Sequence, residues 1–154
     1  MAALNKVKLI QAASKARQRA VAPYSRFQVG AALLTDRGIV VTGANVESAS
    51  YGLTCCAERV TLFKALTGGH KKFLAVAVVA RADGGAMPCG ACRQLLAEYA
   101  PDALVYIADS ANLGQIRKFS VKGLLPGAFL SFRREQIRSG RNHGRTEDFM
   151  AKGK

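Results

Sequence analysis

Three cysteines and one glutamate are the residues whose types and spacing can do chemistry. Cys56 and Glu58 form a Cys-x-Glu motif, and Cys89 and Cys92 form a Pro-Cys-x-x-Cys motif about thirty residues later. Three thiolates can hold one Zn²⁺ and leave its fourth coordination position to water. A glutamate two residues from the first ligand can move protons beside that position. The motifs therefore predict a catalytic zinc centre with one ion per subunit.

Cys55, the neighbour of Cys56, leaves an alternative open. Adjacent residues on a helix point about 100° apart, so these two thiols are not expected to bind the same ion. If Cys55 were a ligand, the site would be a closed four-cysteine structural zinc, although zinc ribbons use two Cys-x-x-Cys pairs. We expect Cys55 to be an ordinary buried residue or a thiol that faces a loop.

Two arginines lie next to the expected ligands. Three thiolates around Zn²⁺ carry a net charge near −1, which a cation bonded to sulfur would offset. Arg59, one helical turn from Cys56, is expected to take this role, and Arg93 is a second candidate; the alternative is that both are surface residues. Without the cysteines, Glu58 would be an ordinary carboxylate at a helix N-terminus.

The apolar periodicity predicts the elements that position these residues. Helices are expected over residues 4–21, 55–66 and 88–99, and strands over 27–35, 39–46, 73–80, 104–108 and 116–121. This order predicts an α/β protein, a three-layer α/β/α sandwich with a mixed sheet of about five strands.

Several local details follow from single residues. We expect Thr54 to cap the second helix, Pro88 to be the first residue of the third, and Gly43 to mark a bulge or a close backbone approach. Val7 and Phe63 are expected on the buried faces of their helices. The catalytic domain is expected over residues 1–132, and a basic tail, partly helical or frayed, over 133–154.

Composition bounds the class of protein. The chain has 154 residues, of which 49% are hydrophobic, and no run of about eighteen apolar residues that would span a membrane. It begins without an apolar signal core, and its four cysteines all lie in the two motif stretches. Clustered cysteines favour metal binding over a secreted disulfide framework, so we expect a cytoplasmic protein.

The net charge of +13, from 23 basic and 10 acidic residues, raises the alternative of a nucleic-acid-binding protein with a structural zinc. The excess is spread over the first helix and the tail, which favours a solvated basic surface. Only 7% of residues are aromatic and none is Trp, so little surface is available for stacking on bases.

Further segments make the chain resemble cytidine deaminase, in its small form with three cysteine zinc ligands. They are APYSRFQVGAAL at 22–33, GANVE at 43–47, ASY at 49–51 and LLPGAF at 124–129, together with the zinc motifs. The resemblance covers about residues 22–129. It implies zinc-dependent hydrolytic deamination of cytidine and deoxycytidine to uridine and deoxyuridine plus ammonia, a reaction of pyrimidine salvage. Glu58 would take a proton from water and pass it to the ring nitrogen and the leaving amine.

The resemblance also implies the substrate-binding residues. Phe27 would pack on the pyrimidine, and Asn45 and Glu47 would hold the ribose hydroxyls. The main-chain carbonyl of Ala57 would accept from the amino group of the base. Taken without the resemblance, Phe27 is a core residue, Asn45 a turn cap and Glu47 an exposed charge.

In this family the small form is a homotetramer whose subunits share active sites, and Tyr51 and Phe129 match the shared positions. The alternative is that both pack within their own chain. Ser48 departs from the family pattern, which has Asn there, and puts one loop contact in doubt. A deaminase of another aminopyrimidine, such as blasticidin, shares the zinc motifs, but only a nucleoside needs a ribose-binding pair. The preference between cytidine and deoxycytidine stays open.

Overall fold

The computed structural model describes residues 5–130 of the chain. Its elements are α1 (Lys6–Arg17), β1 (Val29–Thr35), β2 (Val40–Ala44), the 3-10 helix η1 (Tyr51–Leu53), α2 (Ala57–Thr67), β3 (Phe73–Ala80), α3 (Gly90–Tyr99), β4 (Leu104–Asp109), β5 (Asn112–Ser120) and α4 (Val121–Leu124). The predicted order of elements is confirmed. The predicted tail over 133–154 lies outside the described residues. Among the helices of residues 5–130, none is long and apolar enough to cross a membrane.

The five strands form one mixed sheet in the order β2-β1-β3-β4-β5. Strands β3 and β4 are parallel, and the other neighbours are antiparallel. The β1–β2 hairpin turns at Gly38, whose φ of 79° suits glycine. Both the mixed sheet and the hairpin are as predicted.

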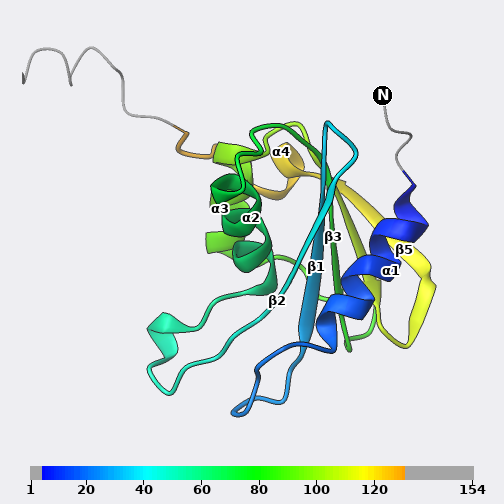
Figure 1. Ribbon diagram of the computed structural model, residues 1–154, viewed down its shortest axis with the longest axis vertical. Coiled ribbons are helices and arrows are strands. Elements are labelled where there is room, and N and C mark those ends of the chain that lie inside the picture. The colour runs from blue at the N-terminus through cyan, green and yellow to red at the C-terminus, as the bar shows by residue number, and fades with distance from the viewer. Residues whose placement is uncertain (1–4, 131–154) are drawn as a thin grey trace, which may run out of the picture.

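Helices cover both faces of this sheet (Figure 1), which confirms the predicted three-layer sandwich. On one face Leu9 and Ile10 of α1 pack with Ala77 of β3. On the other, Leu62 of α2 packs with Val76 of β3. Strand β3 is apolar throughout because its alternating side chains enter two separate cores.

Helix α1 is shorter than predicted. It begins after Asn5, whose Oδ1 accepts the N–H of Lys8 at 3.1 Å, and it ends at Arg17. The chain then becomes extended, because the N–H of Val21 donates to the carbonyl of Asn45. Val7 is 49% exposed, so its predicted place in the core was wrong.

The starts of α2 and α3 also differ from the prediction. Cys56 and Cys89 occupy the N-cap positions, although neither side chain caps a backbone N–H. Thr54 and Pro88 therefore lie before their helices, and both predicted starts were wrong. A ligand cysteine has no capping preference that a sequence pattern would reveal, yet this position brings two cysteines to adjacent helix starts.

The buried face of α2 is rotated from the predicted one. Glu58 and Thr61 are buried, while Phe63 is 43% exposed. The helix lies so close to β2 that a Cβ added at Gly43 would be 2.6 Å from Oγ1 of Thr61. The predicted close approach at Gly43 is thus confirmed, and it brings the start of α2 against the sheet.

Candidate active site

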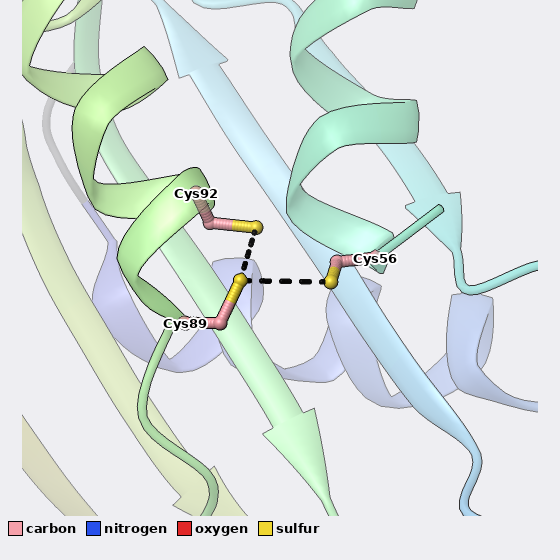
Figure 2. Close-up of side chains that lie close together, drawn as sticks. All are labelled: Cys56, Cys89 and Cys92. Atoms are coloured by element: carbon pink, nitrogen blue, oxygen red, sulfur yellow. Dashed lines mark hydrogen bonds between the residues drawn. The ribbon is translucent and has the colours of Figure 1, made fainter. Parts of the chain in front are cut away.

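The sulfur atoms of Cys56, Cys89 and Cys92 form one cluster between the starts of α2 and α3, and they point toward one another (Figure 2). Sγ of Cys89 lies 3.8 Å from that of Cys56 and 3.5 Å from that of Cys92. A Zn–S distance of about 2.3 Å in a tetrahedral arrangement separates sulfurs by about 3.8 Å. The three thiols therefore fit Zn²⁺ in number, kind and spacing.

The environment stabilises a thiolate at Cys56. The interaction with the Cys92 thiol is the main cause that lowers the pKa of Cys56 to about 5, and Cys89 and Arg59 contribute in the same direction. In this interaction the Cys92 thiol is the donor, so the same hydrogen bond favours its protonated form and raises the pKa of Cys92. The cluster thus favours the thiolate form at one ligand position, which suits a site that binds a cation.

Arg59 lies beside the first of these sulfurs, as predicted. Its Nη2 donates to the carbonyl of Thr54 at 2.6 Å and lies 3.9 Å from Sγ of Cys56. Its buried Nε has no partner among the described residues. A guanidinium in this place offsets negative charge on the thiolates.

Arg93, the second candidate, makes different contacts. Its hydrogen bonds go to the carbonyls of Pro88 and Leu124, at 2.8 and 3.2 Å. It therefore holds backbone next to the cluster and does not bond to sulfur in the structure.

Cys55 lies apart from the cluster. Its backbone pairs with Val46 in an isolated bridge, and its side chain is partly buried. The group of thiols close enough to share an ion contains only Cys56, Cys89 and Cys92 among residues 5–130. This geometry argues against the closed four-cysteine zinc.

Glu58 is a buried carboxyl group, 6% exposed, at the second position of α2. Burial raises its pKa to about 7, and the negative charge of Cys56 adds to this effect. A carboxyl group with such a pKa can both accept and release a proton near neutral pH, which general acid–base catalysis requires.

A cavity of about 280 Å³ opens beside the sulfurs. The predicted site residues that line it are Phe27, Asn45, Glu47, Cys56, Ala57, Glu58 and Cys89. Its wall also contains residues that the sequence did not single out for the site, namely Val29, Thr54, Val78, Ala86 and Met87. Val29, Val78, Ala86 and Met87 are apolar, which did not distinguish them from core residues, and Thr54 was expected only as a helix cap. The volume is close to the lower end for small-ligand pockets.

Asn45 and Glu47 are both tied to the loop that enters β1. Asn45 accepts the N–H of Val29 at 2.8 Å and donates to the carbonyl of Phe27 at 2.9 Å. The Glu47 carboxylate accepts the N–H groups of Tyr24 and Ser25 and the Ser25 hydroxyl. The hydrogen bond from the Ser25 hydroxyl is the main cause that lowers the pKa of Glu47, so this partly exposed carboxylate is ionised at neutral pH.

Ala57 is the first residue of α2 and lines the cavity. Its carbonyl accepts the Thr61 hydroxyl at 2.7 Å. Its N–H belongs to the first turn, where backbone donors have no intrahelical acceptor. Ala57 is therefore better placed to donate to a ligand through its N–H than to accept through its carbonyl.

Tyr51 and Phe129 lie away from this cavity. Tyr51 is 81% exposed and lines a neighbouring hollow of about 400 Å³, which shares Glu47 and Thr54 with the first. Phe129 is 62% exposed, and its carbonyl accepts from Gln94 at 2.6 Å. Within one chain the structure does not bring these two side chains to the cavity beside the sulfurs.

Comparison with known proteins points to one family. The sequence profile described as "Cytidine and deoxycytidylate deaminase zinc-binding region" matches residues 4–108. A cytidine deaminase from Halalkalibacterium halodurans is 54% identical over 122 residues, which are 79% of this chain and 91% of the relative. A blasticidin-S deaminase from Bacillus cereus is 30% identical over 110 residues, which are 66% of this chain and 76% of the relative.

Solved structures agree with the sequence comparison. The crystal structure of a cytidine deaminase from Burkholderia pseudomallei superimposes with a TM-score of 0.78 at 48% sequence identity. The match covers 82% of this chain and all of that one. The fold, the three-thiol cluster and the buried glutamate thus occur together in a chain that matches these proteins over most of their length.

Proposed function

The chain belongs to the cytidine and deoxycytidylate deaminase family, and from this we propose that the cavity beside Cys56 and Cys89 is its active site. The chain is a zinc-dependent cytidine deaminase that hydrolyses cytidine and deoxycytidine to uridine and deoxyuridine with release of ammonia. One observation carries the assignment of the site. Cys56 and Cys89, two of the three thiols at zinc spacing, line the same small cavity as Glu58, a buried carboxyl group.

The metal and the glutamate have separate tasks. Bound Zn²⁺ supplies a Lewis acid that makes water nucleophilic near neutral pH. Cys56, Cys89 and Cys92 would hold it, and Arg59 would offset part of the thiolate charge. Glu58 accepts the proton of the attacking water and delivers protons to the ring nitrogen and then to the departing amino group.

The remaining cavity residues suit a pyrimidine nucleoside. Phe27 offers an aromatic face to the base. The N–H of Ala57 suits the ring carbonyl of the base, because a first-turn amide is a free donor. Asn45 and Glu47 would take the sugar hydroxyls, and their bonds to the 24–29 loop keep them in place.

The substrate is tested by ultraviolet absorbance of the protein mixed in turn with cytidine, deoxycytidine, blasticidin S and a cytosine-containing oligonucleotide. We expect conversion of the two nucleosides alone. The 54% identity to a cytidine deaminase, against 30% to a blasticidin-S deaminase, favours the nucleoside. Conversion of blasticidin S or the oligonucleotide without conversion of nucleosides would overturn the assignment.

Replacement of Glu47 by Ala is expected to raise KM for cytidine roughly 5- to 150-fold, because an unmade hydrogen bond to the ribose costs about 1–3 kcal/mol. Initial rates over a range of cytidine concentrations measure this. Ser25→Ala is the matched control, since it removes one loop contact of this carboxylate and keeps the carboxylate itself. An unchanged KM in Glu47→Ala would place the ribose elsewhere.

We infer that the active form is a homotetramer in which Tyr51 and Phe129 contribute to the sites of neighbouring subunits. Large apolar side chains are exposed on η1 and α2, with Tyr51 at 81%, Leu53 at 74% and Phe63 at 43%. Such patches are typical of protein interfaces. Light scattering is expected to give about four times the chain mass of 16.4 kDa. A fully active monomer would contradict the shared site.

The cytoplasm is the compartment we propose for this reaction, in keeping with a role in pyrimidine salvage. A reducing compartment keeps the three thiols available to the metal, whereas an oxidising one favours disulfides.

A further inference from the structure

Arg93 makes two backbone contacts that its place in the sequence does not reveal. It directly follows Cys92 in the first turn of α3. Its Nε donates to the carbonyl of Pro88 at 2.8 Å, and its Nη1 donates to the carbonyl of Leu124 at 3.2 Å. One guanidinium thus joins the residue before Cys89 to the last residue of α4.

The contact with Pro88 fixes how the chain enters α3. With Cys89 as N-cap, Pro88 is the residue before the cap and Arg93 is the fourth residue of the helix. In many helices these two positions make an apolar contact that sets the entry angle of the chain. Here the contact is a hydrogen bond. It acts on the peptide that places Sγ of Cys89 3.5 Å from Sγ of Cys92.

Helix α2 repeats this arrangement. Arg59 lies in its first turn and donates to the carbonyl of Thr54, two residues before the N-cap Cys56, at 2.6 Å. In both helices the N-cap is a cysteine whose side chain caps no N–H, so the helix start needs another restraint. Over residues 5–130, neither arginine is paired with a carboxylate.

The contact with Leu124 connects the metal centre to the end of the described chain. Leu124 is the last residue of the four-residue helix α4, so its carbonyl accepts no hydrogen bond from within that helix. The next residue of α3, Gln94, donates to the carbonyl of Phe129 at 2.6 Å. Two successive side chains of α3 therefore hold the 124–129 segment against the helix that carries Cys92.

We propose that Arg93 is a positioning residue of the metal centre. By donating to the carbonyls of Pro88 and Leu124, it holds Cys89 in place relative to Cys92. This rests on the proposed zinc site. Arg93 does for Cys89 what Arg59 does for Cys56, but it acts through backbone only. Removal of its side chain should therefore weaken zinc binding more than it lowers the stability of the metal-free fold.

Zinc release and thermal unfolding test this in three variants of the full chain. Arg93→Met removes both hydrogen bonds, and Arg93→Lys keeps the charge with a single donor group. Lys122→Met is the matched control, because Lys122 is a cation of α4 whose side chain is 75% exposed and pairs with Asp102. Zinc release is followed with an excess of a colorimetric chelator, and unfolding with and without zinc.

For Arg93→Met we expect zinc release at least about tenfold faster, in the range seen when groups that orient metal ligands are removed. Zinc raises the Tm of the native chain, and in Arg93→Met this increase should become smaller. The loss should exceed the fall in Tm of the metal-free variant relative to the metal-free native chain. Arg93→Lys should lie between, and Lys122→Met should match the native chain. Equal Tm losses with and without zinc, at an unchanged release rate, would show an ordinary structural arginine. A native chain that binds no zinc would instead refute the proposed function.

Discussion

Replacement of Glu58 by Gln is expected to lower kcat for cytidine by roughly 10²–10⁴-fold while zinc content stays at the native level. General acid–base catalysis contributes a factor of this size. Gln has the same shape and cannot exchange a proton with water or with the base. The carboxyl group is buried, and burial raises its pKa to about 7. Burial disfavours a charged group there, so the neutral amide of Gln fits the site without destabilising the fold.

Steady-state rates and metal analysis of the same sample check this prediction. Asp102→Asn is the control, because it changes an exposed carboxylate to an amide just after the C-terminal end of α3. The thermal midpoint of Glu58→Gln should equal or exceed that of the native chain. Native kcat in Glu58→Gln would remove Glu58 from the mechanism.

Replacement of Cys89 by Ser is expected to release zinc and to lower kcat/KM by about 10³-fold or more. A bound metal contributes several kcal/mol of transition-state stabilisation, and each 1.36 kcal/mol is a factor of ten in rate. Two thiols do not complete the ligand set of a zinc site. The Tm of the variant should equal that of the native chain stripped of metal, and added zinc should no longer raise it.

Cys55→Ser provides the matched control for that variant. It makes the same change one residue from a ligand, at a thiol that lies outside the cluster. We expect native zinc content and activity. Zinc measured by atomic absorption at one ion per chain in Cys89→Ser would show that the ligand set is different.

Most of the strands were predictable because each carries its own signal. The last was predicted over 116–121, but β5 begins earlier, at Asn112, and Val121 belongs to α4. Strand β3 (Phe73–Ala80) coincides with the predicted range, since a short, β-branched apolar run between polar residues suits a strand covered on both faces. The β1–β2 hairpin follows from a turn that needs glycine at Gly38.

The helix starts at the site were not predictable from local preference. Thr54 is a better capping residue than Cys56, yet Cys56 is the N-cap, and this position brings its sulfur into the three-thiol cluster. The exposure of Phe63 on α2 similarly runs against its apolar character. The subunit contacts proposed above would cover this side chain, and a single chain does not reveal such a surface.

The zinc motifs could be read from the sequence because their residue types and spacing match a known ligand pattern, and the structure brings the three thiols together. The contacts that support them were not legible. Arg93 bonds to Leu124, 31 residues away, and Ser25 bonds to Glu47, 22 residues away. Such pairs depend on the packing of distant segments, for which the sequence has no local pattern.

Stepwise addition of zinc to the metal-stripped chain, with cytidine conversion followed by absorbance, is the most direct measurement. We expect almost no conversion at the start, a linear rise in rate as zinc is added, and a break at one zinc ion per chain. Conversion at the native rate before any zinc is added would contradict it. So would a break at a different ratio, because the three thiols form one site.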